Sequence, residues 1–355
     1  MKRLFTTFVF LMALATSGIA QDQHFSQFYA SPMTLNPALT GTFDGRYRLA
    51  IIYRDQWRSV LEEPYVTMGG AVDTRFPLRF RRKRVRDAVG VGVQFFSDRV
   101  PSVDFSTNQM MLSGAFHKAL GGSRSNQFLS LGVQFGVNQR NIGYSRLDFG
   151  DQFNGNNGFT EPTREVLPEN NFSFGDLSIG LNYSLAPERG VGIFVGGAIH
   201  HLLEPQVSFF IDRNPNDVDN FNGDNRLFRK YTAHFGMQIP MGNSVQLLPR
   251  AVVYKQGPHL AANLGSNIRF LLHDISGTAL HIGSWARPVG DQNNRFGMDA
   301  IVIMTGLEFN NFLLGFSYDA NLNTFSMAGR RRSAFEISLA FLGLYENEVV
   351  LCPKF

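Results

Sequence analysis

Arg46–Trp57 reads Arg-Tyr-Arg-Leu-Ala-Ile-Ile-Tyr-Arg-Asp-Gln-Trp, and this stretch predicts the fold of the chain. Every second residue from Tyr47 to Tyr53 is apolar or aromatic, whereas the residues between them are mostly basic or small. Side chains on a strand alternate between its two faces, so the stretch predicts a strand with one apolar and one basic face. Aromatic rings at both ends of the apolar face, with aliphatic residues between them, suit a surface that crosses a bilayer. A length of about ten residues is enough for one tilted crossing.

The same two-residue period recurs along most of the chain. It is clearest over Phe128–Arg140, where Leu129, Leu131, Val133 and Phe135 alternate with polar residues and glycine. We predict about fourteen strands, an even number as expected of a single-chain outer-membrane barrel. The predicted strands are Arg46–Trp57, Tyr65–Arg75, Ala88–Phe96, Phe105–Lys118, Phe128–Arg140, Phe174–Leu185, Val191–His201, Lys230–Ile239, Val245–Tyr254, Leu260–Leu271, Thr278–Ala286, Arg295–Phe309, Phe312–Tyr318 and Ser333–Leu344.

The predicted connections between strands differ in length on the two sides of the sheet. Counting alternately from a periplasmic N-terminus puts both long connections, Asn141–Asn171 and Leu202–Arg229, on the same side. The other side has mostly tight turns, such as Pro240–Asn243. Outer-membrane barrels have long extracellular loops and short periplasmic turns. We therefore predict an all-β fold, a transmembrane antiparallel β-barrel, and keep a soluble all-β fold as the alternative.

The first residues have the features of a secretory signal. Lys2 and Arg3 precede the apolar run Leu4–Ala15, and small residues lead up to Ala20, after which we expect cleavage. No later run is long and apolar enough for a membrane helix, so residence in a membrane would require a closed barrel. We expect residues 1–20 to be the signal peptide, 21–44 a periplasmic or plugging segment, 45–344 the barrel and 345–355 a C-terminal tail.

The segment Gln21–Gly41 differs from the rest of the chain. Pro32 and Pro37 exclude a regular central strand there. Its aromatic and aliphatic residues make it too apolar for a free tail, namely Phe25, Phe28, Tyr29 and Leu35. We expect the segment to pack inside the barrel or against its periplasmic mouth, with a poorly ordered exposed arm as the alternative.

The run from His24 to Trp57 also resembles a known family. It contains Phe-Ser-Gln-Phe-Tyr-Ala-Ser-Pro, Leu-Asn-Pro-Ala-Leu-Thr-Gly and Tyr-Arg-Asp-Gln-Trp, and these motifs resemble the PorP/SprF family of outer-membrane proteins of Bacteroidetes. The chain end, Cys352-Pro353-Lys354-Phe355, is similar to that family as well. The resemblance implies a part in type IX secretion and gliding. It also implies work with periplasmic and peptidoglycan-linked components, or with the C-terminal domain of a secreted adhesin.

Composition and motifs give no sign of catalysis. The net charge of +4 is small and scattered over 355 residues, which does not favour a nucleic-acid partner. Cys352 is the only cysteine, so no internal disulfide can form. We find no nucleophile motif and no His or Cys spacing typical of a metal site. We therefore expect no enzyme activity, no cofactor and no metal.

One polar stretch could still bind an ion. Asp212–Asn225 contains Asp217, Asp219, Asn222 and Asp224, which could gather oxygen atoms around calcium, but turn chemistry explains the same residues. His200 and His201 are adjacent, so on a strand they would face opposite sides and could not share a metal.

We expect a non-catalytic outer-membrane barrel, surrounded by outer-membrane lipid, that serves type IX secretion or gliding. Candidate partner-binding residues are Phe25, Phe28, Tyr29, Asn36 and Arg54. The basic run Arg79–Arg86, placed between the second and third strands, could dock an acidic periplasmic partner through Arg81, Arg82 and Arg84, although solvated charge is the simpler reading. The alternative function is a passive diffusion channel. Inward-facing residues would then make it mildly anion-favouring, namely Arg46, Arg48, Arg54, Gln134, Lys230 and Arg250.

Overall fold

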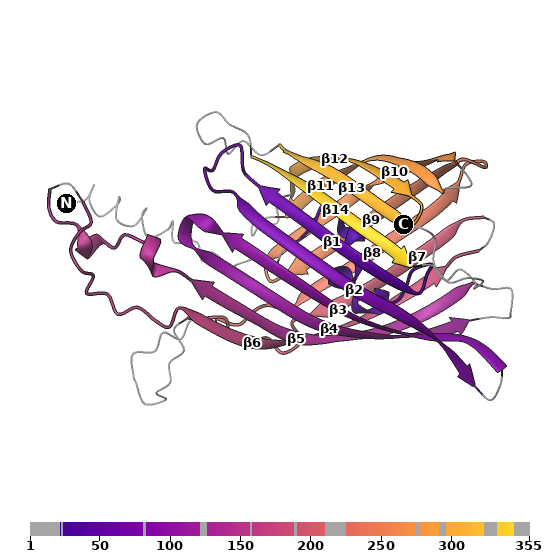
Figure 1. Cartoon of the computed structure of the whole chain (residues 1–355), viewed down its shortest axis with the longest axis horizontal. Helices are drawn as coiled ribbons and strands as arrows, with labels where there is room; N and C mark the ends of the chain where they lie inside the picture. The colour runs from indigo at the N-terminus through magenta and orange to yellow at the C-terminus, as the bar shows by residue number, and fades with distance from the viewer. Residues whose placement is uncertain are drawn as a thin grey trace.

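The computed structural model describes residues 22, 24–80, 83–120, 126–156, 158–187, 190–209, 225–273, 277–290, 296–322 and 332–343. Within these residues, fourteen antiparallel strands form one closed barrel (Figure 1). The strands are β1 (Tyr47–Gln56), β2 (Tyr65–Phe80), β3 (Lys83–Val100), β4 (Phe105–Leu120), β5 (Gln127–Ile142), β6 (Asn171–Leu185), β7 (Gly192–His200), β8 (Lys230–Pro240), β9 (Val245–Gln256), β10 (His259–His273), β11 (Thr278–Gly290), β12 (Phe296–Phe309), β13 (Phe312–Asn321) and β14 (Ser333–Gly343).

Each strand pairs with its neighbours in the chain, and β1 pairs with β14 to close the cylinder. The closing register runs from Tyr47 opposite Gly343 to Gln56 opposite Ala334. Within the described residues every strand therefore has a paired neighbour on both sides, as a structure surrounded by lipid requires. Among the described residues, no helix is both long and apolar enough to cross a membrane. The predicted antiparallel barrel of fourteen strands is confirmed.

The two faces of the wall differ as the alternating sequence predicts. On β5, Leu131 and Phe135 are 58% and 57% exposed on the outside of the barrel, whereas Ser130 and Gln134 are buried inside it. On β1, Ile51 is 56% exposed while Arg48 and Arg54 are buried. Large exposed apolar side chains recur on almost every strand. This continuous apolar outer surface is the one that a membrane barrel presents to lipid.

Connection lengths separate the two ends of the barrel. Residues 143–170 and 201–229 form long connections at one end, which we call the long-loop end. The opposite end, the short-turn end, has tight turns such as residues 310–311 and 241–244. Among the described residues, the long-loop end also carries three short 3₁₀ turns, η3 (Pro101–Val103), η4 (Tyr144–Arg146) and η5 (Gly150–Gln152).

The β2–β3 hairpin is longer than predicted. We expected Arg79–Arg86 to be a connection, but β2 continues to Phe80 and β3 begins at Lys83, with Arg79 opposite Arg84. The prediction was wrong because Phe76, Leu78 and Phe80 continue the two-residue apolar period beyond Arg75. Pro77 is accommodated because the register shifts between Pro77 and Arg79, at an irregularity of the kind that tolerates proline.

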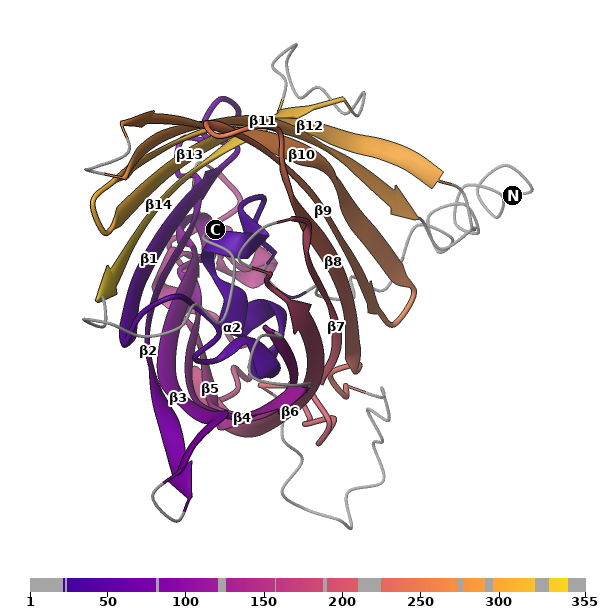
Figure 2. The ribbon, with the colours of Figure 1, turned by 90° about the vertical axis from the view of Figure 1, so that its right-hand side faces the viewer.

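The segment before β1 lies inside the barrel, and we call residues 24–44 the plug (Figure 2). It contains the turns η1 (Phe28–Ala30), α2 (Pro32–Leu35) and η2 (Pro37–Leu39). Pro32 and Pro37 each occupy the first turn of a helical element, where the missing N–H of proline costs no hydrogen bond. The prolines that exclude a strand thus begin compact turns that fit the lumen.

The plug runs along the lumen from one end of the barrel to the other. Asp22, just before it, lies against His201 and Lys230 at the long-loop end. At its other end, the N–H of Arg46 donates to the carbonyl of Gly343 at the short-turn end, where β1 begins. Our count of connections placed the start of the chain at the short-turn end, and the described part of the chain starts instead at the long-loop end.

Candidate functional site: the plugged lumen

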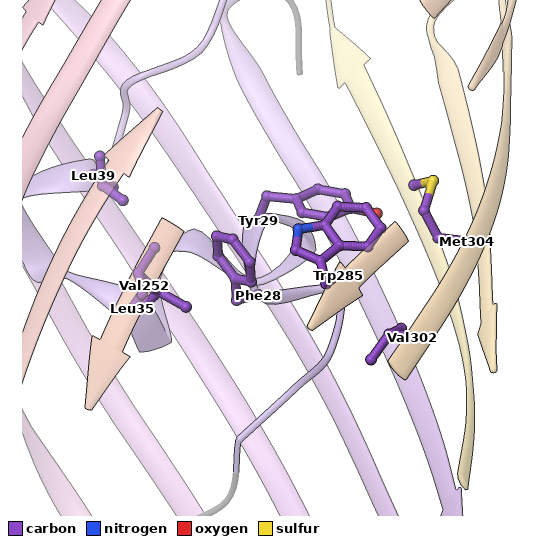
Figure 3. Packing of buried hydrophobic residues seen from close by; sticks show 8 residues of the cluster. All are labelled: Phe28, Tyr29, Leu35, Leu39, Val252, Trp285, Val302 and Met304. Atoms are coloured by element: carbon purple, nitrogen blue, oxygen red, sulfur yellow. The ribbon is translucent and has the colours of Figure 1, made fainter. Parts of the chain in front are cut away.

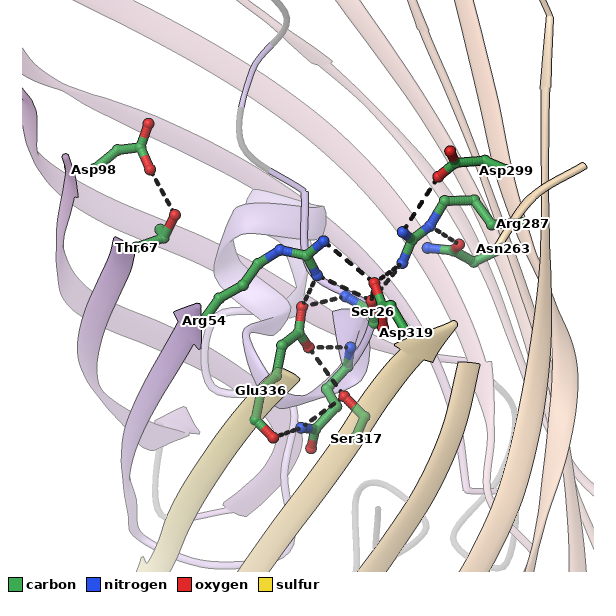
Figure 4. A network of polar contacts seen from close by, with 11 residues as sticks. Ser26, Arg54, Thr67, Asp98, Asn263, Arg287, Asp299, Ser317, Asp319 and Glu336 are labelled. Carbon is green, nitrogen blue, oxygen red and sulfur yellow. Dashed lines mark hydrogen bonds and ion pairs between the residues drawn. The ribbon is translucent and has the colours of Figure 1, made fainter. Parts of the chain in front are cut away.

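The first anchor of the plug is a buried ionic network (Figure 4). The backbone N–H groups of Ser26 and Gln27 donate to the two carboxylate oxygens of Glu336 on β14, at 2.7 and 2.8 Å. The Ser26 hydroxyl donates to Asp319 Oδ2 on β13 at 2.7 Å. Ser26 and Gln27 of the plug are therefore bound by two carboxylates of the barrel wall.

Two guanidinium groups compensate the charge of these carboxylates. Arg54 on β1 contacts Glu336 and lies 3.2 Å from Asp319 Oδ2. Arg287 on β11 lies 2.9 Å from the same oxygen of Asp319. Every side chain in this network is almost fully buried. Removing one partner of such a pair leaves an uncompensated buried charge and typically costs about 3–5 kcal/mol.

The second anchor lies towards the short-turn end. Arg48 on β1 and Asp73 on β2 form a bidentate pair, with Nε–Oδ1 at 2.9 Å and Nη2–Oδ2 at 2.7 Å. Asp73 Oδ2 also accepts the backbone N–H of Gly41 at 2.7 Å. Nearby, His117 lies 2.9 Å from the carbonyl oxygen of Thr40. The wall thus uses charged and polar side chains to satisfy the backbone of the plug, which has no sheet partner of its own.

Asn36 joins the middle of the plug to three strands. Its Oδ1 accepts the N–H of Ala38 at 2.8 Å, and its Nδ2 donates to the carbonyls of Leu181 on β6 and Gly197 on β7, at 3.0 and 3.2 Å. The Nδ2 atom is also 3.1 Å from His234 Nε2. Asn36 is fully buried, and its amide is bonded at both ends.

Apolar side chains of the plug and the wall also pack together inside the barrel (Figure 3). Tyr29 stacks on Trp285 of β11 with ring centroids 5.9 Å apart, and the Arg250 guanidinium lies 4.4 Å above the Tyr29 ring. Phe25 packs against Phe96 at 5.6 Å. The larger cluster consists of Phe28, Tyr29, Leu35, Leu39, Val252, Trp285, Val302 and Met304. This barrel therefore has a hydrophobic core inside its wall, where a diffusion pore would have water.

A small charged cluster holds the chain just before the plug. His201 Nε2 lies 2.5 Å from Asp22 Oδ2, and His201 Nδ1 lies 2.7 Å from Asp176 Oδ2. Lys230 Nζ is 3.3 Å from the same oxygen of Asp22. Burial opposes the charged form of His201, but the carboxylates of Asp22 and Asp176 outweigh it and raise the His201 pKa to about 9. Burial likewise opposes the charged form of Asp22, but His201 and Lys230 hold its pKa well below its usual value.

The two adjacent histidines do not face opposite sides as we predicted. β7 ends at His200, and His201 has a positive φ of 58°, which turns its side chain back into the lumen. Both rings are buried, with centroids 6.5 Å apart. The alternation rule failed because it holds only within a strand. Among the described residues, no group of three or more His, Cys, Asp or Glu side chains is placed to hold a metal ion.

The structure places the candidate partner-binding residues in two groups. Phe25, Phe28, Tyr29, Asn36 and Arg54 are buried in the lumen, and all their described contacts are within this chain. Arg84 lies in β3, while Arg81 and Arg82 are outside the described residues. Partner binding by any of these residues stays a prediction.

Three of the inferences from sequence concern residues that the structure does not describe. The calcium candidates Asp217, Asp219 and Asp224, the signal peptide and the chain end at Cys352 lie outside the described residues. Of the residues expected to face inward, Arg46 is exposed just before β1, while the others are buried in the lumen or at its mouth, namely Arg48, Arg54, Gln134, Lys230 and Arg250.

Three acids that bind the plug were not among the residues predicted from the sequence, namely Asp73, Asp319 and Glu336. A signal for them was present. Each lies on the inward side of a strand and beside at least one apolar outward residue, so a carboxylate there must enter the lumen. A charged residue at a buried position implies a charged or hydrogen-bonding partner.

Comparisons with known proteins give a family match and several structures of low similarity. A family model described as "Type IX secretion system membrane protein PorP/SprF" matches residues 17–341. A search of curated proteins finds no match. Similar solved structures include a FadL homologue of Pseudomonas aeruginosa, with TM-score 0.48 and 10% identity, covering 92% of this chain and 95% of that one. The toluene transporter TodX of P. putida has TM-score 0.47 and 9% identity, covering 88% and 93%. BamA from Haemophilus ducreyi lacking POTRA domains 1–3 has TM-score 0.42 and 10% identity, covering 84% and 70%.

Proposed function

Because the chain belongs to the PorP/SprF family of type IX secretion system membrane proteins, we propose that it is a closed, non-catalytic anchor of that machinery in the outer membrane. The observation that carries the proposal is the plug. Its backbone is bound by the wall at Glu336, Asp319 and Asp73, and its apolar side chains complete a core inside the barrel. A barrel filled in this way is suited to holding other proteins in place at a membrane.

The two ends of the barrel offer different surfaces to partners. We propose that the long-loop end faces the cell exterior, as in other outer-membrane barrels, and holds the C-terminal domain of a secreted adhesin. The short-turn end would then meet periplasmic secretion and gliding components, including peptidoglycan-linked ones. The β2–β3 hairpin, with Arg81, Arg82 and Arg84 in its sequence, is our candidate for the periplasmic contact. Buried plug residues such as Asn36 would support these contacts indirectly, by keeping the barrel rigid.

The buried contacts do not favour the alternative of an anion-favouring pore. Arg48 is paired with Asp73, and Arg54 with Asp319 and Glu336, so their charges are compensated within the wall. Arg250 is buried and lies over the ring of Tyr29. Cations held in this way do not line a water-filled path across the membrane.

Deleting the gene tests the proposed role. We expect a specific set of exported proteins to disappear from the surface of the deletion strain and to return when the intact gene is restored. Mass spectrometry of proteins released from intact cells by a protease measures this set. An unchanged surface proteome in the deletion strain would reject the role in secretion.

A charge-reversed variant tests the periplasmic contact separately. Replacing Arg81, Arg82 and Arg84 by glutamate should abolish co-purification of periplasmic components in mild detergent. Heat-dependent gel mobility shows whether the variant barrel still assembles. Unchanged co-purification by an assembled variant would remove the hairpin from the proposal while leaving the anchoring role in place.

A further inference from the structure

A polar cavity of about 270 Å³ lies at the long-loop end of the lumen. Its wall comes mainly from the inward faces of β3, β4 and β5, and Asp22 and Phe25 border it on the side of the plug. It is separate from the ionic network that binds Ser26 and from the apolar cluster around Trp285. The anchoring role proposed above does not use it.

The strand register arranges the cavity wall in rows. Asp98 on β3 lies opposite Thr107 on β4, and Thr107 lies opposite Arg140 on β5. All three residues line the cavity. Neighbouring strands are about 4.8 Å apart, so the backbones of Asp98 and Arg140 are about 10 Å apart across β4. A carboxylate and a guanidinium therefore face the same cavity with a hydroxyl between them.

Neither Asp98 nor Arg140 forms an ion pair within the described part of the chain, and the charges of Arg54 and Asp22 act on them only from farther away. Thr67 donates to Asp98 Oδ1 at 2.5 Å, and Figure 4 shows Asp98 apart from the Arg54 network. Arg140 lies over the ring of Phe174, with its guanidinium carbon 5.8 Å from the centroid. In contrast, the other cations at the cavity, His201 and Lys230, both lie beside Asp22. The cavity thus presents one carboxylate and one guanidinium that do not pair with each other.

Several buried polar atoms at the cavity also lack a hydrogen-bond partner among the described residues. They are Gln94 Oε1, Gln134 Nε2, Asn138 Nδ2, Arg140 Nε and His200 Nε2. Gln94 and Gln134 are each 2% exposed, and Asn138 is 4% exposed. An unsatisfied buried polar atom typically costs about 1–3 kcal/mol, so five of them around one cavity call for a polar occupant.

We propose that this cavity binds a zwitterionic ligand of the amino-acid or short-peptide class. The carboxylate of the ligand pairs with Arg140 and accepts from Asn138, while its ammonium group pairs with Asp98. Gln94 and Gln134, deeper in the cavity, bond the remaining polar groups of the ligand. A cavity of about 270 Å³ holds more than a single water molecule and has room for a small polar ligand.

Charge-blocked dipeptides test the proposal directly. Calorimetry on the full-length protein in detergent would compare glycylglycine with N-acetylglycylglycine, which lacks the ammonium group, and with glycylglycinamide, which lacks the carboxylate. We expect glycylglycine to bind and each blocked analogue to bind at least about tenfold more weakly, because each loses a charged hydrogen bond. Failure of glycylglycine to bind, or equal binding of either analogue, would overturn the proposal.

Two variants test which residue binds each end of the ligand. In Arg140→Gln, glycylglycine and glycylglycinamide should bind equally, and in Asp98→Asn, glycylglycine and N-acetylglycylglycine should bind equally. Arg146→Gln is the matched control, because Arg146 is exposed at the same end, pairs with Glu63 and does not line the cavity. Heat-dependent gel mobility confirms assembly of each variant. If Arg140→Gln still prefers glycylglycine to glycylglycinamide as strongly as wild type does, Arg140 does not bind the carboxylate. If Asp98→Asn still prefers glycylglycine to N-acetylglycylglycine as strongly, Asp98 does not bind the ammonium group.

Discussion

At the scale of single residues, His201 shows how a titratable group can hold the plug. Its two ring nitrogens lie against carboxylates from different parts of the chain, Asp22 before the plug and Asp176 on β6. The charged imidazole is buried but is bonded on both sides, so its pKa rises from 6.5 to about 9. Protonated His201 therefore ties the start of the plug to the wall at neutral pH.

This arrangement predicts a pH-dependent stability. A group with a raised pKa in the folded state contributes its full stability below the unfolded value of 6.5, and loses that stability as the pH rises through about 9. We expect His201→Gln to destabilise the barrel by up to about 3 kcal/mol at pH 6, and by much less at pH 10. The temperature of the heat-dependent gel shift, measured for both proteins at the two pH values, tests this.

The wild-type protein measured alone would not isolate His201, since other groups also titrate above pH 9. The difference between wild type and His201→Gln removes their contribution, because both proteins carry those groups. A stability difference of equal size at pH 6 and pH 10 would contradict the assigned charge of His201.

The sequence predicts the direction of many lumen side chains but not their partners. Arg48 and Arg54 were placed inward by the alternation of β1, and both are buried there. Their partners come from β2, β13 and β14. The alternation along a strand shows which residues face inward, but not which inward acid lies at the same level along the barrel axis. That information depends on the register between strands, which a single sequence does not contain.

At the scale of elements, glycines in the wall make room for the plug. A side chain on Gly132 of β5 would collide with backbone atoms of Pro37 and Ala38 in η2, and one on Gly180 of β6 would collide with the Asn36 side chain. Both glycines face the lumen. The backbone of the plug therefore contacts the backbone of the wall directly, which only glycine allows.

Gly132→Val should displace the plug without disrupting the wall. The added side chain would meet backbone that cannot move aside by rotating a bond, so we expect a cost of about 1–3 kcal/mol or expulsion of η2 from its place. Planar-bilayer recordings should show little steady conductance for wild type and frequent open-channel events for the variant. Protease should also cleave the displaced plug faster.

Gly114→Val is the matched control for this experiment. Gly114 lies on β4, and a side chain there would meet no atom within 4 Å. This variant should conduct like wild type. Open channels in both variants would show that any bulky residue loosens the barrel, and a silent Gly132→Val variant would show that the plug tolerates the added side chain.

The number of strands was predictable because every lipid-facing strand repeats the same two-residue pattern. Most predicted strand ends agree with the structure to within a few residues, and β2 and β3 are the clear exceptions. There, a run of arginines was taken as a loop although apolar residues alternated with it. The turns of the plug have no such period, and only Pro32 and Pro37 indicated that this segment is not a strand.

At the scale of the whole molecule, the path of the chain sets a condition on assembly. The plug enters at the long-loop end and leaves at the short-turn end to begin β1, while β1 and β14 pair to close the wall around it. A segment bound on all sides by a closed cylinder cannot be inserted sideways afterwards. The plug must therefore be in place before the closing pair forms, or thread lengthwise through the finished barrel.

This path predicts on which side of the membrane the segment just before the plug is exposed. If the long-loop end faces the exterior, an epitope inserted between Gln21 and Asp22 should bind antibody on intact cells, because Asp22 lies at that end beside His201. An epitope at Gly155, in the long connection 143–170, should also be reached, whereas one at Gly242, in the turn between β8 and β9, should require permeabilised cells.

An accessible Gly155 epitope with an inaccessible N-terminal one would refute the path of the plug. A reversed pattern for Gly155 and Gly242 would refute the orientation of the barrel instead, so the three insertions together separate how the chain is threaded from how the barrel sits in the membrane.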